Sequence, residues 1–195
     1  MYLSTGEPKF RRWIDASAEM AGLPSWEVHG DLFLPGELLE AVVLQESAGH
    51  PAARRYEPHQ DRAGRRDASE DADRPGADDG LFEDDASYGL MQVMGYNARR
   101  IVGASPGTPL NFGFLLRAQA GLAFGLRILV DELEATGGDV PRALARYNGG
   151  PTGDVLEPQG TMRRQVYVDG VEAKAFLVRG NRLERGWRYL VGATA

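Results

Sequence analysis

Glu46 lies where a protein could use a carboxylic acid as a proton donor. It follows Val42 and Val43 by four and three residues, at the trailing edge of the apolar face of an expected helix. Gly49 is a suitable C-terminal cap for that helix, and Pro51 stops any continuation. Glu46 is therefore expected in the last helical turn, beside the negative end of the helix dipole.

This location would favour the protonated form of the carboxyl group. Partial burial and the helix dipole both disfavour the charged form of Glu46, so both raise its pKa. A carboxyl with a pKa of roughly 6–7 donates a proton near neutral pH, which is typically worth about 10²–10⁴-fold in rate. The alternative is a glutamate exposed at a frayed helix end, and the spacing alone does not decide between the two.

Two further short blocks follow along the chain. Residues 87–92 read Ser-Tyr-Gly-Leu-Met-Gln, and residues 145–150 read Ala-Arg-Tyr-Asn-Gly-Gly. Each block also has a structural interpretation. Leu90, Met91 and Val93 suit a hydrophobic core, and an Asn-Gly-Gly-Pro sequence is an ordinary end of a helix.

The order of the three blocks, with Glu46-Ser47 first, resembles the lytic transglycosylase family with the goose-type lysozyme-like fold. The resemblance extends over roughly residues 36–175. Residues 165–168, Gln-Val-Tyr-Val, are similar to the family's final tyrosine-valine helix, and residues 55–58, Arg-Tyr-Glu-Pro, look like a segment of its phage-associated members. The resemblance implies an all-α, lysozyme-like single domain, which agrees with helical patterns that leave little room for sheet.

The resemblance also implies a reaction. Members of the family cleave the β-1,4 bond between N-acetylmuramic acid (MurNAc) and N-acetylglucosamine (GlcNAc) in peptidoglycan. One glutamate protonates the leaving oxygen and then accepts the proton of the C6 hydroxyl, which closes a 1,6-anhydro ring without water. Glu46 matches that glutamate, and a carboxyl with a pKa near neutrality can serve in both steps.

Seven further residues are implied to bind the substrate, namely Ser47, Ser87, Met91, Gln92, Tyr147, Asn148 and Tyr167. Met91 would pack on a sugar, Gln92 would place its amide in the cleft, and Tyr147 would point toward the catalytic glutamate. The resemblance implies no metal and no cofactor. Two residues depart from the family pattern, because Arg146 stands where many members carry a small residue and Gly170 lies inside the expected last helix.

Two other functions stay open. A goose-type muramidase would hydrolyse the same bond and would need a second carboxylate, for which Glu83, Asp84 and Asp85 are candidates. A non-catalytic virion or wall-binding protein could use the same scaffold, although the intact Glu46 weighs against it.

The chain is expected to consist of three parts. Residues 1–34 would form an N-terminal helical extension packed on the core, residues 35–180 the catalytic domain, and residues 181–195 a C-terminal tail. Within the domain, residues 59–86 are dense in Asp, Arg, Gly and Ala, which predicts a mobile acidic insert. The apolar run Phe112–Leu133 contains arginines, which predicts a buried helix and not a membrane span. Gly113, Gly121 and Gly125 in this run would allow close approach, and Asp139 is expected to cap the next helix.

The composition of the chain limits the kinds of partner and of metal site that it can have. The 195 residues suffice for one domain. The formal net charge of −6 argues against a nucleic-acid partner, and the absence of cysteine excludes disulfides and thiolate metal sites. We expect a monomer that acts on peptidoglycan glycan strands without membrane insertion. The first residues show no signal peptide, so we expect synthesis in a host cytoplasm and release by a phage route or in a virion.

Overall fold

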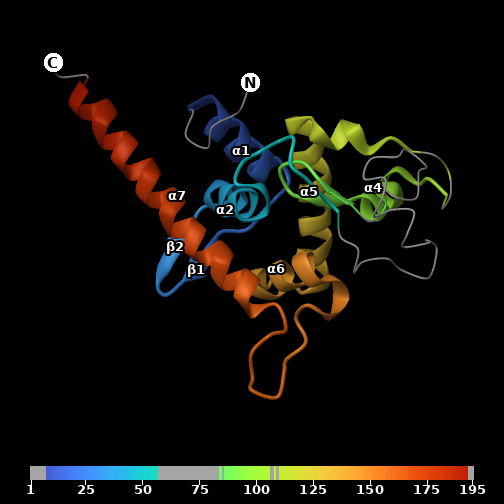
Figure 1. The fold of residues 1–195 in the computed structure, drawn as a ribbon. Helices are drawn as coiled ribbons and strands as arrows, with labels where there is room; N and C mark the ends of the chain where they lie inside the picture. Colours follow the sequence, from blue (N-terminus) through green and yellow to red (C-terminus); the bar gives the residue numbers. More distant parts are fainter. Residues whose placement is uncertain (1–7, 57–83, 85, 106–107, 109, 193–195) are drawn as a thin grey trace. The chain divides into compact units, whose positions relative to one another are not determined.

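The computed structural model describes residues 8–56, 84, 86–105, 108 and 110–192. These residues form six α-helices, two 3₁₀ helices and two small sheets (Figure 1), so the predicted all-α class is confirmed. In chain order the elements are α1 (Pro8–Met20), β1 (Trp26–Val28), β2 (Asp31–Phe33), α2 (Pro35–Ser47), β3 (Arg54–Tyr56), β4 (Ala86–Tyr88), β5 (Val93–Met94), α4 (Gly95–Val102), η3 (Phe112–Leu116), α5 (Ala118–Ala135), α6 (Val140–Gly149), η4 (Gly150–Thr152) and α7 (Gln165–Gly192). Within the part of the chain that is described, no helix combines the length and the apolar character needed to cross a membrane.

The chain divides into two compact units. The first combines Leu3–Gln45 with Arg127–Ala195, and the second spans Glu46–Leu126. Both boundaries fall inside helices, one in α2 and one in α5. Glu46 is therefore the first residue of the second unit, at the end of a helix that belongs largely to the first.

In the first unit, α2 is buried on nearly every side. The predicted apolar face is confirmed, since no surface is exposed on Leu38, Leu39, Val42 or Val43. Glu37 and Glu40, which the pattern places on other faces, are also buried, with 6% and 2% of their surface exposed. Buried carboxylates need partners, and helix α7 provides them.

Helix α7 passes beside α2 (Figure 1), and two arginine–glutamate pairs join the two helices. Arg179 Nη2 lies 3.0 Å from Glu37 Oε2, and Arg182 Nη2 lies 2.8 Å from Glu40 Oε2. Both pairs use residues three apart, which lie on one face of each helix. Helix α7 continues to Gly192, so the residues from 181 that were expected as a C-terminal tail include Arg182, which is part of this contact.

The N-terminal extension over residues 1–34 contains helix α1 as expected, but it also contains a β-hairpin that was not predicted. Strands β1 and β2 pair antiparallel, with Trp26 opposite Phe33. The two turn residues His29 and Gly30 both have positive φ, of 52° and 87°, which suits the twist of a two-residue hairpin. The guanidinium of Arg179 lies 3.8 Å from the centre of the Phe33 ring, so the hairpin also packs on α7.

In the second unit, strands β3, β4 and β5 form an antiparallel sheet in that order. The apolar run Phe112–Leu133, expected to be one helix, is divided into η3 and α5. The division starts at Asn111, whose Oδ1 accepts a 2.7 Å hydrogen bond from the Gly113 amide and so begins a separate short helix. The insert expected over residues 59–86 lies outside the described residues, apart from Asp84 and Ala86.

Candidate active site

Glu46 lies in the last turn of α2 and is half-buried, as the sequence predicted. The helix ends at Ser47, and the chain then passes through Ala48 and Gly49 with φ of 52° and 81°. Gly49 was the expected cap, but Ala48 also adopts the left-handed conformation, which costs a non-glycine residue about 1–2 kcal/mol. The backbone next to Glu46 is therefore strained and held in place by its surroundings.

One such contact joins the first block to the second. The Ser47 hydroxyl donates a 2.9 Å hydrogen bond to the carbonyl oxygen of Leu90. Because Ser47 follows Glu46 directly, this bond ties the end of α2 to the Gly-Leu-Met-Gln turn. Of the two roles open to the family serine, orienting the glutamate is the one that this bond supports.

Gln92 closes that turn from inside. Its Nε2 donates to the carbonyl oxygens of Gly89 at 3.0 Å and Ala53 at 3.3 Å. Its Oε1 accepts a 2.8 Å hydrogen bond from the hydroxyl of Ser87, which is 2% exposed. Both donors and the acceptor of the amide are thus used within the protein. Gln92 and Ser87 therefore hold the turn together. These bonds favour an amide that faces the protein, whereas the resemblance implied an amide that faces the substrate.

Met91 lies in the core and has no exposed surface. It packs on Gly125 of α5, where an added Cβ would overlap with the Met91 side chain and lie 2.6 Å from its sulfur. Leu90 and Val93 are buried as well. The core interpretation that the sequence left open therefore accounts for these residues, and Met91 is not presented to a sugar.

The turn approaches the start of α5 so closely that glycine is required. Gly89 has a φ of 75°, and a Cβ there would overlap with the carbonyl oxygen of Leu115. A Cβ on Gly121 would lie 2.5 Å from the same oxygen. The expected role of Gly121 and Gly125 in close approach is confirmed.

The third block forms the end of α6, in the first unit. Asp139 caps this helix as predicted, since its Oδ1 accepts a 3.0 Å hydrogen bond from the Arg142 amide. Tyr147 is half-buried and Asn148 is exposed in the last turn. Tyr167, on α7, is 8% exposed.

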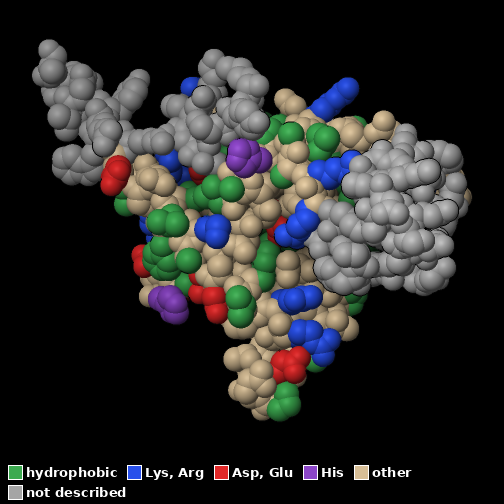
Figure 2. Space-filling model, in the orientation of Figure 1, with side chains coloured by type: hydrophobic (Ala, Val, Ile, Leu, Met, Phe, Trp, Pro, Cys, Tyr) green, Lys and Arg blue, Asp and Glu red, His purple; other side chains and the backbone are tan. Residues whose placement is uncertain are grey.

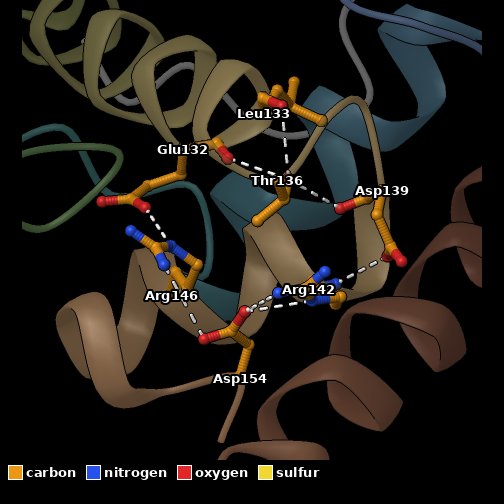
Figure 3. Close-up of polar contacts among 7 residues, drawn as sticks. All are labelled: Glu132, Leu133, Thr136, Asp139, Arg142, Arg146 and Asp154. Atoms are coloured by element: carbon orange, nitrogen blue, oxygen red, sulfur yellow. Dashed lines mark hydrogen bonds and ion pairs between the residues drawn. The ribbon is translucent and has the colours of Figure 1, made fainter.

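Ion pairs surround the end of α6 (Figure 3). Arg146 Nε lies 2.6 Å from Glu132 Oε2 of α5, and Arg146 Nη1 lies 3.8 Å from Asp154 Oδ1. Arg142 Nη2 lies 2.8 Å from Asp154 Oδ2. The hydrogen bond that Arg146 donates to Glu132 raises the pKa of Arg146 further above its ordinary value, so this arginine stays charged. The residue before Tyr147 is thus fixed by two carboxylates.

A family model for the transglycosylase SLT domain matches residues 33–164, more than half of the chain. The chain belongs to the transglycosylase SLT domain family. Proteins of this family are lytic transglycosylases, lyases that act on peptidoglycan, and so is this chain. The matched range contains all three blocks and ends before Tyr167. No curated protein sequence matches the chain.

The structure explains both departures from the transglycosylase pattern. Arg146 is the centre of the ion pairs in Figure 3, which tie α6 to α5 and to the loop after η4. Gly170 gives room to Gln45 of α2, because an added Cβ would lie 2.8 Å from Gln45 Oε1. Lys174 donates a 2.7 Å hydrogen bond to the same oxygen. Gln45 precedes Glu46, so α7 also contacts the last turn of α2.

Three acids were candidates for the second carboxylate of a goose-type muramidase. One of them, Asp84, is bound to an arginine of the protein. Both of its carboxylate oxygens lie within 3.1 Å of Arg99 Nε, and Arg99 is 5% exposed. Arg99 Nη1 also donates to the carbonyl oxygens of Ser105 and Thr108. Glu83 and Asp85 lie outside the described residues. Among the residues that are described, no three His, Asp or Glu side chains are grouped to hold a metal ion.

Proposed function

We propose that Glu46 is the single acid and base of this transglycosylase, which cleaves the MurNAc–GlcNAc β-1,4 bond. The Glu46 carboxyl gives its proton to the glycosidic oxygen as the bond from that oxygen to C1 of MurNAc breaks. The carboxylate then accepts the proton of the C6 hydroxyl, whose oxygen bonds to C1. The products are a GlcNAc end and a 1,6-anhydro-MurNAc end, and no water is consumed.

The observation that carries this proposal is the placement of Glu46. It is half-buried in the last turn of α2, next to the serine that is bonded to the Leu90 carbonyl. A carboxyl at the negative end of a helix dipole is more easily kept protonated than a fully solvated one. A proton donor must also be held in position, and the bonds of Ser47 and Gln45 on either side supply that constraint.

We assign the remaining predicted residues to two roles. Ser47, Ser87 and Gln92 shape the turn beside Glu46 through their hydrogen bonds. Tyr147, Asn148 and Tyr167 are proposed to bind the glycan strand. The exposed side chain of Asn148, directly before the glycine pair, is open to a ligand, which supports its part in this assignment.

The contacts of Asp84 weigh against the hydrolytic alternative. A muramidase needs a second carboxylate that is able to hold and activate a water molecule. Both oxygens of Asp84 are instead bound by the buried Arg99, which occupies them within the protein.

Mass spectrometry of digested peptidoglycan tests the proposal. The native protein should release muropeptides lighter by one water than the reducing products of a muramidase. Glu46→Gln should abolish release, while its helical spectrum and melting temperature stay near those of the native protein. Glu172→Gln is a matched control. Burial, together with the charge of Asp169, raises the pKa of Glu172, so it is a second partly buried glutamate. It has no part in the proposed reaction, and its substitution should leave activity unchanged. Reducing products, or substantial turnover by Glu46→Gln, would contradict the proposal.

A further inference from the structure

Four arginines lie on α6 and in the loop before α7, and three of them are paired with carboxylates. Arg142 pairs with Asp154, and Arg146 pairs with Glu132 and Asp154 (Figure 3). Arg163 Nε lies 3.0 Å from Glu157 Oε1.

The fourth, Arg164, has an exposed side chain. Its guanidinium pairs with no carboxylate among the residues that the structure describes. The loop that carries it, residues 153–164, presents basic and acidic side chains at the lower end of the space-filling view (Figure 2). Because its neighbours are each neutralised within the protein, Arg164 is the arginine of this group whose charge is available to a ligand.

Arg164 is nevertheless held in a defined place. Its amide donates a 3.1 Å hydrogen bond to the Gly153 carbonyl oxygen, and its own carbonyl oxygen accepts a 3.0 Å hydrogen bond from the Tyr167 amide. Its aliphatic stem lies on Gly149, where an added Cβ would be 2.7 Å from Arg164 Cγ and 3.0 Å from Nε. Since Gly149 follows Asn148, the arginine is fixed beside the residues proposed to bind the glycan.

A fixed guanidinium that pairs with no carboxylate of the described residues suits a carboxylate ligand. Its planar fork forms two parallel hydrogen bonds to a carboxylate, and it keeps its charge at any physiological pH. Peptidoglycan carries carboxylates on its muramic acid residues, either on the free lactyl group or on the peptide stem that is joined to this group by an amide bond. The chain has a net charge of −6, so an anionic strand gains little from the average surface and needs a local positive contact.

We propose that Arg164 binds a carboxylate of the muramic acid unit, and that Gly149 is small so that Arg164 can reach it. This inference rests on the proposed function in that the strand is assumed to pass along the end of α6. It adds a residue that distinguishes peptidoglycan from an uncharged glycan such as chitin.

Binding should be measured in the inactive Glu46→Gln protein, so that the result does not depend on the reaction. The ligands are glycan strands with peptide stems, strands stripped of peptides by an amidase, and chito-oligosaccharides, which have no carboxylate. Arg164→Gln should weaken binding of a carboxylate-bearing strand about tenfold and leave chito-oligosaccharide binding within about twofold. Arg164→Lys should be intermediate, because it keeps the charge but loses the fork. Arg163→Gln is the control and should behave like the parent.

The two sources of carboxylate give different outcomes. If the loss for Arg164→Gln persists on stripped strands, the lactyl carboxylate is the ligand; if it is confined to strands with stems, the stem carboxylate is. A double-mutant cycle adds an independent check. Gly149→Ala should displace Arg164 and weaken binding by a similar factor, and combining it with Arg164→Gln should add nothing further. Equal binding by Arg164→Gln and its parent on both strands, or an equal loss on chito-oligosaccharides, would overturn this assignment even if Glu46 proves catalytic.

Discussion

The two units of this transglycosylase fix their functional segments by different means. In the second unit, the turn beside Glu46 is held by neutral hydrogen bonds of Ser47, Ser87 and Gln92 and by glycines pressed against backbone. In the first unit, α2 and α6 are held by arginine–carboxylate pairs with α7, α5 and the loop after η4.

The difference has consequences for how each region responds to change. Close glycine packing leaves no room for added volume, and neutral hydrogen bonds are little affected by salt. Ion pairs tolerate changes of volume better, but they depend on both charges being present, and more so the deeper they are buried. Three comparisons between variants distinguish these two kinds of response.

The largest effect is expected from breaking the buried pair that joins α7 to α2. Burial lowers the pKa of Arg182, but the hydrogen bond to Glu40 and the nearby charge of Asp15 outweigh it and raise the pKa. Arg182→Met would leave Glu40, 2% exposed, with only the more distant Arg11 at 3.9 Å. We expect a loss of about 3 kcal/mol in the free energy of unfolding, measured in urea.

A second variant and a control make this result specific. Combining Arg182→Met with Glu40→Met should restore much of the lost stability, because the buried Glu40 charge that had lost Arg182 is then removed as well. Arg127→Met removes an exposed pair with Asp131, in which Arg127 is 67% exposed, and should cost no more than about 0.5 kcal/mol. Similar losses for the Arg182 and Arg127 variants would show that burial is not what makes the α2 contact important.

An intermediate effect is expected in the second unit, from added volume. Gly89→Ala places a Cβ against the Leu115 carbonyl at a φ of 75°, and should cost about 2 kcal/mol through strain and overlap together. Gly103 has a similar φ of 70° but no atom within 4 Å of an added Cβ. Gly103→Ala should therefore cost only about 1 kcal/mol. Equal melting temperatures for the two variants would mean that the turn and α5 are not in close contact.

Sequence reasoning succeeded where the cause is local. The last turn of α2 and the cap at Asp139 depend on residues within one or two turns, and spacing predicts them. A partner that is distant in the chain leaves no such pattern. Glu40 gains its partner 142 positions later, so spacing alone does not predict that Glu40 is buried.

The turn residues show a different limit. Gln92 was given a place in the cleft because its amide could contact a sugar, but the same groups are satisfied by Gly89, Ala53 and Ser87. Residue type does not tell which of two suitable partners a polar group will have. In the structure, Gln92 has an unusual backbone conformation, with a φ of 46°. The sequence contains no pattern that predicts this conformation.

The smallest effect is expected from a direct comparison of a neutral hydrogen bond with an ion pair in their response to salt. Ser47→Ala removes a neutral hydrogen bond and should cost about 1 kcal/mol. Arg146→Gln removes the pair with Glu132, in which both side chains are about one-fifth exposed, and should also cost about 1 kcal/mol at low salt. Unfolding in urea at about 0.05 M and 1 M NaCl separates them, because the Debye length falls to about 3 Å at 1 M. The loss for Arg146→Gln should shrink by about half, while the loss for Ser47→Ala should not change. A salt-dependent loss for Ser47→Ala would mean that charge, and not the bond to Leu90, holds the turn beside Glu46.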